Sequence, residues 1–564
     1  MKLRPRVTAR LGRAVAAATA LGVALLVPTA TAPAVGAAAT HALIQGSGSS
    51  WAANAINQWV ADVANQGMQV VFTANGAAQG RKDYANRSND FGVSDIPFHG
   101  ADPTTGQEDS PRGRSYAYLP IAAGGTSFPY HVEVAGKLVR NIRLSGETIA
   151  KIFTSQITNW NDPQITSDNN GKALPSIPII PVVHSEGAGV TNQFTRYLAK
   201  EYPSIWGPCN GGKTVETEYF PLNCGKSTGN QKAQAGSDGV MNFIKSAGAN
   251  GSIGIEEYSY PLLADFPAIK VLNKAGYYTL PTQYNVAVAL TKAVIDKDPS
   301  SPTYLTQNLD QVYTNPDKRT YPLSSYVYAI IPTASDDSRM TTAKRQTLAD
   351  FLYFSICQGQ SEIGPIGYSS LPVNLVTAGF EQIDKLKDAD PRVDLTQRDV
   401  STCHNPTFIA GKPDVNHLAE IAPNPPACDK VGADPCVAGV GAYNGDDPTD
   451  DKNNQPSGGS GSGGGGSGTG GGSGSGTGTG GGADTGGSSG VNSDLGLGGT
   501  GTAGSADDPA AAGGDIVPTT LAAGSSSGPT STLTVLVIGL LTLAVVLPAV
   551  VSRLLSRRSG GGVR

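Results

Sequence analysis

The amino-acid sequence predicts an α/β fold, because strand-like and helix-like segments alternate through its central part. The runs 68–73 and 177–183 are rich in apolar residues and indicate strands. Apolar residues at helical spacing indicate helices at 53–63 and 190–200. Short turns rich in glycine and other small residues join strands to the helices that follow them. This order of elements is typical of sheets covered by helices.

The turn Ser-Glu-Gly-Ala-Gly at 185–189 follows the strand at 177–183 and precedes a helix that begins near Val190. At such a turn the first N–H groups of the helix have no partner within the helix, and the positive end of the helix dipole points at the turn. Both features favour an anion. Similar small-residue turns occur at 46–50, 74–80 and 90–97. We expect these turns to converge on one ligand.

Several motifs are similar to those of the phosphate-binding proteins of ABC importers. They include Gly-Ser-Gly-Ser-Ser-Trp at 46–51, Asp-Phe-Gly-Val-Ser-Asp-Ile-Pro at 90–97 and His-Ser-Glu-Gly-Ala-Gly-Val-Thr-Asn-Gln-Phe-Thr at 184–195. The similarity runs in order from about residue 43 to about residue 380. The chain therefore resembles a family of receptors that capture phosphate and hand it to a permease in the membrane.

The resemblance implies a two-lobed type II periplasmic-binding-protein fold with a ligand cleft between the lobes. Residues 42–118 and 283–386 would form lobe 1, and residues 119–282 would form lobe 2. In this family the ligand is held by backbone N–H groups, hydroxyls, an arginine and an aspartate that accepts a hydrogen bond from protonated phosphate. Its positions fall here on Ser50, Trp51, Gly76, Ala77, Asp95, His184, Glu186, Gly187, Ala188, Gly189 and Val190.

Five of these positions depart from the family pattern. The usual arginine has become His184, and its carboxylate partner has become Glu186. Hydroxyl residues have become Ala77, Ala188 and Val190. Because a hydrogen bond to a charged group contributes about 1.5–3 kcal/mol, losing three donors lowers the expected affinity for phosphate by several orders of magnitude.

Several interpretations of the site remain open. Phosphate still binds if Arg81 or Lys82 replaces the arginine and His184 contributes when protonated; otherwise Arg81 is an ordinary solvated helix residue and His184 a satisfied interface histidine. A second interpretation is a pocket retuned to an organic phosphate or another small polar molecule, and a third is a surface scaffold or adhesin without a ligand. A fourth is a hydrolase that uses Ser50, His184 and Asp95, although Ser50 does not stand in a Gly-x-Ser-x-Gly elbow.

The ends of the chain indicate export and a membrane tether. Residues 1–39 resemble a signal peptide and contain no cysteine for a lipid anchor. The Pro-rich segment 387–436 is expected to pack on lobe 1, and the Gly/Ser-rich segment 437–530 is expected to be a disordered, flexible linker. The apolar run 533–555 predicts a single transmembrane helix, with the basic tail 556–564 in the cytoplasm and the binding domain outside the cell.

Six cysteines in an exported chain suggest disulfides, although six cysteines allow fifteen pairings. Two close pairs bracket short loops, and the remaining two cysteines would tie the globular part to its last segment. The expected pairs are Cys209–Cys224, Cys357–Cys403 and Cys428–Cys436.

Composition excludes some function classes. The net charge is −5 and no long basic stripe occurs outside the termini, so a nucleic-acid partner is not expected. The six histidines show no pair at metal-ligand spacing, so neither a metal nor another cofactor is expected. We expect a monomeric receptor that is not an enzyme, captures phosphate or a related anion, and is tethered near an ABC permease, which raises its effective concentration there.

Overall fold

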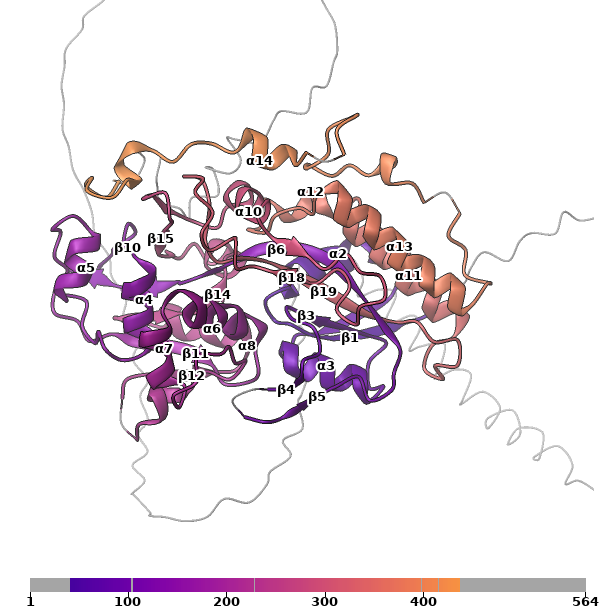
Figure 1. Cartoon of the computed structure of the whole chain (residues 1–564), viewed down its shortest axis with the longest axis horizontal. Helices are drawn as coiled ribbons and strands as arrows, with labels where there is room; N and C mark the ends of the chain where they lie inside the picture. Colours follow the sequence, from indigo (N-terminus) through magenta and orange to yellow (C-terminus); the bar gives the residue numbers. More distant parts are fainter. Residues whose placement is uncertain (1–40, 103–104, 228, 397, 414, 437–564) are drawn as a thin grey trace, which may run out of the picture. The chain divides into compact units, whose positions relative to one another are not determined.

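The structure is a computed structural model of the chain, and it describes residues 41–436 except 103–104, 228, 397 and 414 (Figure 1). Outside the described residues lie the expected signal peptide (1–39), linker (437–530), transmembrane helix (533–555) and basic tail (556–564). Within the described part, no helix is both long and apolar enough to cross a membrane. The mixed α/β architecture that the sequence predicts is confirmed.

The large sheet has six strands in the order β14-β6-β19-β3-β1-β2. Strand β1 pairs in parallel with β2 and β3, whereas β19 pairs antiparallel with β3 and β6. Every residue of β19 is buried, because β19 lies inside the sheet between β6 and β3 and helix α10 packs on it. The strands are β1 (Ile44–Gly48), β2 (Val70–Thr73), β3 (Phe91–Ser94), β6 (Tyr116–Ser127), β14 (Glu256–Glu257) and β19 (Ser324–Pro332).

The helices associated with this sheet are amphipathic or buried. Helix α2 buries Ile56, Trp59 and Val63, which share one face at helical spacing. Helices α11 and α13 lie side by side (Figure 1). The helices are α2 (Ala53–Ala64), α3 (Ala77–Ala85), α10 (Gln283–Leu290), α11 (Thr342–Ile356), α12 (Gln360–Ile363) and α13 (Val373–Ala389).

The second half of the fold is built on two smaller sheets. A four-stranded sheet has the order β12-β11-β13-β7, and a three-stranded sheet has the order β10-β15-β16. Their strands are β7 (Tyr130–His131), β10 (Arg143–Leu144), β11 (Ile180–His184), β12 (Lys232–Gln234), β13 (Ser252–Gly254), β15 (Lys270–Leu272) and β16 (Tyr278–Thr279). Their helices are α4 (Gly146–Phe153), α5 (Pro163–Asp168), α6 (Gly189–Glu201), α7 (Pro203–Cys209), α8 (Gly236–Lys245) and α9 (Ser259–Leu263).

Short elements complete the described chain. They are β4 (Gly100–Ala101), β5 (Glu108–Asp109), β8 (Glu133–Val134), β9 (Lys137–Leu138), β17 (Val294–Ile295), β18 (Gln307–Asn308), α14 (His417–Ile421) and the 3₁₀ turns η1 (Leu222–Gly225), η2 (Val400–Thr402) and η3 (Ala427–Asp429). The boundary expected between residues 118 and 119 falls within β6, in the part of that strand that pairs with β19. The assignment of residues to two lobes stays a prediction.

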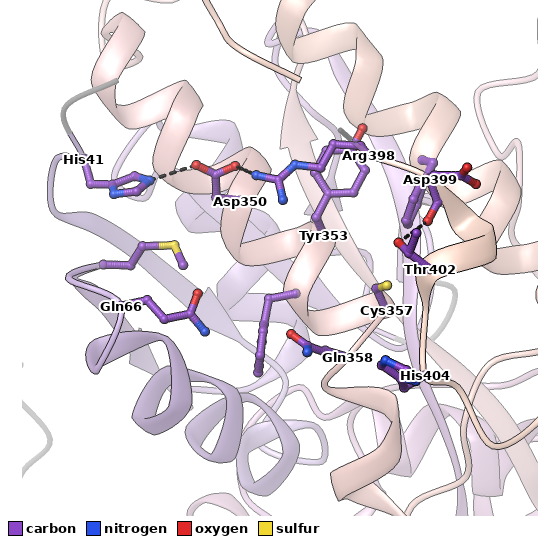
Figure 2. A pocket seen from close by; sticks show the side chains of 13 residues that line it. His41, Gln66, Asp350, Tyr353, Cys357, Gln358, Arg398, Asp399, Thr402 and His404 are labelled. Atoms are coloured by element: carbon purple, nitrogen blue, oxygen red, sulfur yellow. Dashed lines mark hydrogen bonds and ion pairs between the residues drawn. The ribbon is translucent and has the colours of Figure 1, made fainter. Parts of the chain in front are cut away.

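The segment that follows α13 is fixed first to the large-sheet half. The disulfide Cys357–Cys403 joins it to the end of α11. Arg398 forms an ion pair with Asp350 of α11, and its guanidinium carbon lies 5.0 Å from the ring centre of Tyr353 (Figure 2). A charge-paired, cross-linked contact therefore holds the start of this segment.

A cavity of about 370 Å³ lies between this segment, α11 and the N-terminal end of the described chain. Figure 2 shows side chains that line it. His41 Nε2 lies 2.8 Å from a carboxylate oxygen of Asp350, and Arg398 binds the other oxygen. The charged groups that meet here pair with one another. None of the expected ligand residues lines this cavity.

Helix α14 of this segment packs on α10, beside the large sheet (Figure 1). The segment then reaches the second half of the fold. Lys270 of β15 forms an ion pair with Asp429 at 2.9 Å, and Arg143 of β10 donates to the carbonyl of Cys428 at 2.8 Å. The segment 387–436, which we expect to pack on lobe 1, therefore also contacts β10 and β15, because cations of the three-stranded sheet bind its carboxylate and carbonyl groups.

All three expected disulfides are confirmed: Cys209–Cys224, Cys357–Cys403 and Cys428–Cys436. They close loops of 15, 46 and 8 residues respectively. A cross-link limits the freedom of the unfolded chain more when the loop that it closes is longer.

Replacing Cys357 and Cys403 together by alanine is expected to lower the free energy of unfolding by about 4 kcal/mol, because the lost cross-link closes 46 residues. Replacing Cys428 and Cys436 together is the matched control, with an expected loss of about 2.5 kcal/mol for 8 residues. Urea unfolding of both double variants measures the difference. A larger loss in the control would contradict the loop-length argument.

Candidate functional site

Helices α2, α3 and α6 begin at or near turns that the sequence singles out, and α8 begins close to them in the fold. No side chain caps their first turns from the N-cap positions, which are Ala52, Gly76, Ala188 and Ala235. Elsewhere, α4, α5, α10 and α11 are capped by the side chains of Ser145, Asp162, Thr282 and Thr341. The first N–H groups of α2, α3, α6 and α8 must therefore find partners outside their own N-caps.

Backbone hydrogen bonds show that these helix starts meet. The N–H of Ala78 in α3 donates to the carbonyl of Gly187, which precedes α6, at 3.1 Å. The N–H of Gly236 at the start of α8 donates to the carboxylate of Glu186 at 3.1 Å. Because α3 belongs to the large-sheet half and the other groups belong to the second half, this is where the two halves touch.

Ser50, the predicted ligand hydroxyl before α2, lies at the same contact. Its hydroxyl is 2.9 Å from the hydroxyl of Ser237 in α8, and its carbonyl accepts a hydrogen bond from Tyr260 at 2.6 Å. The carbonyl of the neighbouring Trp51 accepts from Tyr368 at 2.6 Å. The start of α2 is thus held by side chains from both halves of the fold.

Asp95 lies directly after β3 and is only 2% exposed. A Cβ atom built on Gly189, the first residue of α6, would lie 1.7 Å from Asp95 Oδ2. Only glycine therefore fits at this point while the carboxyl group keeps its place. The side-chain amide of Gln193 donates to the carbonyl of Asp95 at 3.0 Å, and Oδ2 has no hydrogen-bond partner among the described residues.

The environment of Asp95 favours its protonated form. Burial is the main cause and raises the pKa of Asp95 to about 7. The charge of Glu218 adds to this effect, whereas the Ser49 hydroxyl and the charge of Arg81 oppose it. Near neutral pH the carboxyl group therefore exchanges readily between acceptor-only and donor forms.

Arg81 is fully buried. Its Nε donates to Asp109 at 2.8 Å, Nη1 donates to Ser94 at 2.8 Å, and Nη2 donates to Glu218 at 2.6 Å. Burial alone would lower the pKa of Arg81, but the two carboxylates raise it, so the guanidinium stays charged. The interpretation of Arg81 as a solvated helix residue is wrong, because its three partners surround it inside the fold. Its neighbour Lys82 is exposed.

His184, at the end of β11, has partners at both ring nitrogens. Nδ1 lies 2.8 Å from Glu186 Oε1, and Nε2 lies 3.2 Å from the carbonyl of Ile255 and 3.3 Å from Glu256 Oε1. Burial alone would lower the pKa of His184, but hydrogen bonds and charges from Glu186 and Glu256 raise it to about 10. The ring is therefore a cation at neutral pH, and its bonds go to protein groups.

Three positions at this contact carry buried apolar side chains where the family has hydroxyl groups. They are Ala77, Ala188 and Val190. The backbones beside these positions are closely packed. A Cβ atom on Gly187 would lie 2.6 Å from the Cβ atom of Ala78, so these neighbouring backbones are already in contact. Gly76 takes a φ of +96°, a conformation that favours glycine at the start of α3.

A cleft of about 230 Å³ opens beside this contact. Its basic side chains are Arg81, Lys82 and His99. Its acidic side chains are Asp102, Glu108, Asp109, Glu186 and Glu218. Acidic groups thus outnumber basic groups in the lining, which disfavours a strongly charged anion unless a carboxylate is displaced.

The structure does not arrange Ser50, Asp95 and His184 as a catalytic relay. Among the described residues, no hydrogen bond joins any two of the three. The hydroxyl of Ser50 pairs with Ser237, and the ring of His184 pairs with Glu186. The described residues also hold no group of three or more side chains suited to a metal ion.

Sequence reasoning brought Ser50, Asp95 and the turn 184–190 to one place, and the structure does so too, while their roles toward a ligand stay predictions. It assigned no role to five residues that build the site, namely Ser94, Asp109, Glu218, Ser237 and Glu256. Ser94 lies within the motif 90–97, which carries part of the family resemblance. The only signal for Glu218 was a loop enclosed by two cysteines.

Asp95→Asn is expected to change the pH dependence of folding stability. The folded chain holds the Asp95 proton more tightly than the unfolded chain, so this stability is complete below about pH 3.8 and is lost as the pH rises to about 7. Asparagine does not titrate, so the variant does not lose this stability. Its free energy of unfolding, measured relative to that of the native chain, should rise by up to about 4 kcal/mol across this range. Denaturant unfolding at several pH values measures it.

Asp265→Asn is the control, because this carboxylate is 78% exposed. Its stability difference from the native chain is expected to change little with pH. If the Asp95→Asn difference is as flat as that of the control, the Asp95 carboxyl group is not held in its protonated form by the fold.

Curated relatives are phosphate-binding proteins. Phosphate-binding protein PstS 3 of Mycobacterium leprae is 29% identical over 338 residues, which covers 58% of this chain and 83% of that protein. PstS2 of Mycobacterium bovis is 29% identical over 340 residues, covering 58% and 83%. PstS of Xylella fastidiosa is 28% identical over 337 residues, covering 59% and 82%.

Among solved structures, a phosphate-binding protein from Stenotrophomonas maltophilia matches with a TM-score of 0.45 and 15% sequence identity, covering 60% of this chain and 94% of that chain. A family model described as the PBP superfamily domain matches residues 28–358. This match covers more than half of the chain and agrees with the motifs at 46–51, 90–97 and 184–195. The chain belongs to the PBP superfamily.

Proposed function

We propose that the chain is an extracellular solute-binding protein that captures inorganic phosphate, or a related small anion, between two lobes. The observation that carries this proposal is the buried carboxyl group of Asp95, which lies at the start of α6 with Oδ2 unpartnered among the described residues. Such a carboxylate accepts a hydrogen bond from a protonated phosphate oxygen, while the N–H groups and dipole of α6 favour the charge. The names of the curated relatives support this choice of ligand.

Entry of the ligand requires the two halves of the fold to separate, because Asp95 packs directly on Gly189. We infer a hinge motion that opens this contact and closes again when the anion touches both lobes. A membrane tether through 533–555 would keep the receptor near an ABC permease, to which it delivers the anion.

A second candidate is a receptor retuned to a less charged polar ligand. The acidic lining of the cleft favours it, together with apolar side chains at Ala77, Ala188 and Val190, because these positions offer no hydroxyl donors to an anion. A ligand that donates hydrogen bonds would suit the carboxylates better than phosphate does.

Calorimetric titration of the purified chain with phosphate and sulfate at neutral pH separates the two candidates. We expect phosphate to bind with micromolar affinity or tighter, and sulfate to bind at least about tenfold more weakly, because sulfate has no proton to donate to Asp95. Asp95→Asn should weaken phosphate binding and remove the preference over sulfate, whereas Asp265→Asn should change neither. No heat and no thermal shift with either anion would exclude phosphate.

A further inference from the structure

Glu218 reaches the site from a loop that the fold holds in place. The loop follows α7 and is closed by the disulfide Cys209–Cys224. Next to Glu218, the N–H of Thr217 donates to the hydroxyl of Thr195 in α6 at 3.0 Å, and that hydroxyl donates back to the carbonyl of Thr217 at 2.8 Å. The side chain of Glu218 is 2% exposed, so its position is set by packing and not by solvent.

The carboxylate of Glu218 binds the guanidinium of Arg81 across the contact between the two halves. Its Oε2 lies 2.6 Å from Arg81 Nη2, and both side chains are almost completely buried. Its other oxygen, Oε1, has no hydrogen-bond partner among the described residues. Glu218 therefore offers Arg81 a negatively charged carboxylate, as an anionic ligand would. Only one of its two oxygens is used.

The other partners of Arg81 bind Nε and Nη1, so Nη2 of the guanidinium is left to Glu218. Asp109 binds Nε and also lies 2.8 Å from His99, and it comes from the same half of the fold as Arg81. Ser94 binds Nη1 directly beside Asp95. The Nη2 edge is the one that faces the second half of the fold, where the start of α6 lies.

A guanidinium binds carboxylate and phosphate oxygens with the same forked geometry. Arg81 and Glu218 both act on the charge state of Asp95, so the three groups lie within electrostatic reach of one another. An anion that enters beside Asp95 meets an arginine whose Nη2 edge is already bound by a carboxylate. The anion and Glu218 cannot both take this edge.

We propose that Glu218 is an internal competitor of the anion for Arg81, and that it determines how tightly the site binds tetrahedral anions. This inference rests on the proposed function, because it names the residue that tunes that same site. Glu218→Gln keeps the length of the side chain and removes its charge. Arg81 then gains a stronger attraction for an incoming anion.

Phosphate titration of the full chain by calorimetry tests this inference on the native protein, Glu218→Gln and Glu216→Gln. We expect Glu218→Gln to raise the affinity for phosphate at least about tenfold, and to raise that for sulfate as well, because a guanidinium binds both anions. Glu216→Gln makes the same substitution in the same loop without a contact to Arg81, so it is expected to leave the affinity unchanged. Arg81→Gln added to Glu218→Gln should remove the gain.

Glu218→Asp provides a second variant, because a shorter side chain withdraws from Arg81 while it keeps its charge; a smaller gain in affinity is expected. If the native chain binds phosphate and neither Glu218 variant binds it more tightly, the competitor role is overturned and the phosphate function stands. Tight binding by Glu218→Gln alone supports the competitor and refutes phosphate as the ligand of the native chain. Absence of binding by all of them overturns both proposals.

Discussion

The side chain of Asp95 packs against the backbone at the start of α6 so closely that only glycine fits at 189. This contact joins the end of a strand in the large sheet to the first helix after β11 of the small sheet. It buries a carboxyl oxygen without a partner among the described residues, which is costly unless the group is protonated. Neighbouring bonds hold it in place, from Gln193 to Asp95 and from Ala78 to Gly187.

Electrostatics around this contact follow one pattern. Each buried cation of the site faces two carboxylates: Asp109 and Glu218 for Arg81, and Glu186 and Glu256 for His184. Two carboxylates keep each cation charged, and their excess charge disfavours a further anion nearby. Burial raises the pKa of Asp95, and the charge of Glu218 adds to this effect. Affinity for an anion therefore depends on which of these carboxylates can separate from Arg81 or His184.

The sequence was sufficient to predict the main strands and helices, and to predict that the small-residue turns before the helices meet. Apolar periodicity placed β11 and α6 within a few residues. It was insufficient for Arg81 and Glu218, because ion pairs between residues far apart in the chain leave no local pattern. The reach of the segment 387–436 to β15 was missed for the same reason, since it depends on Lys270 and Asp429.

The final segment, 387–436, and the ion pair of Arg81 and Glu218 both connect the two halves of the fold. The segment is anchored near Cys403 on one half of the fold and at Asp429 on the other, and α14 lies between these anchors on α10. Any separation of the halves must keep the distance between the anchors within the reach of this stretch of chain. In the proposed hinge motion, the pair of Arg81 and Glu218 favours the closed arrangement without an anion. The binding energy of an anion is consequently the difference between its own contacts and those of the carboxylate that it replaces.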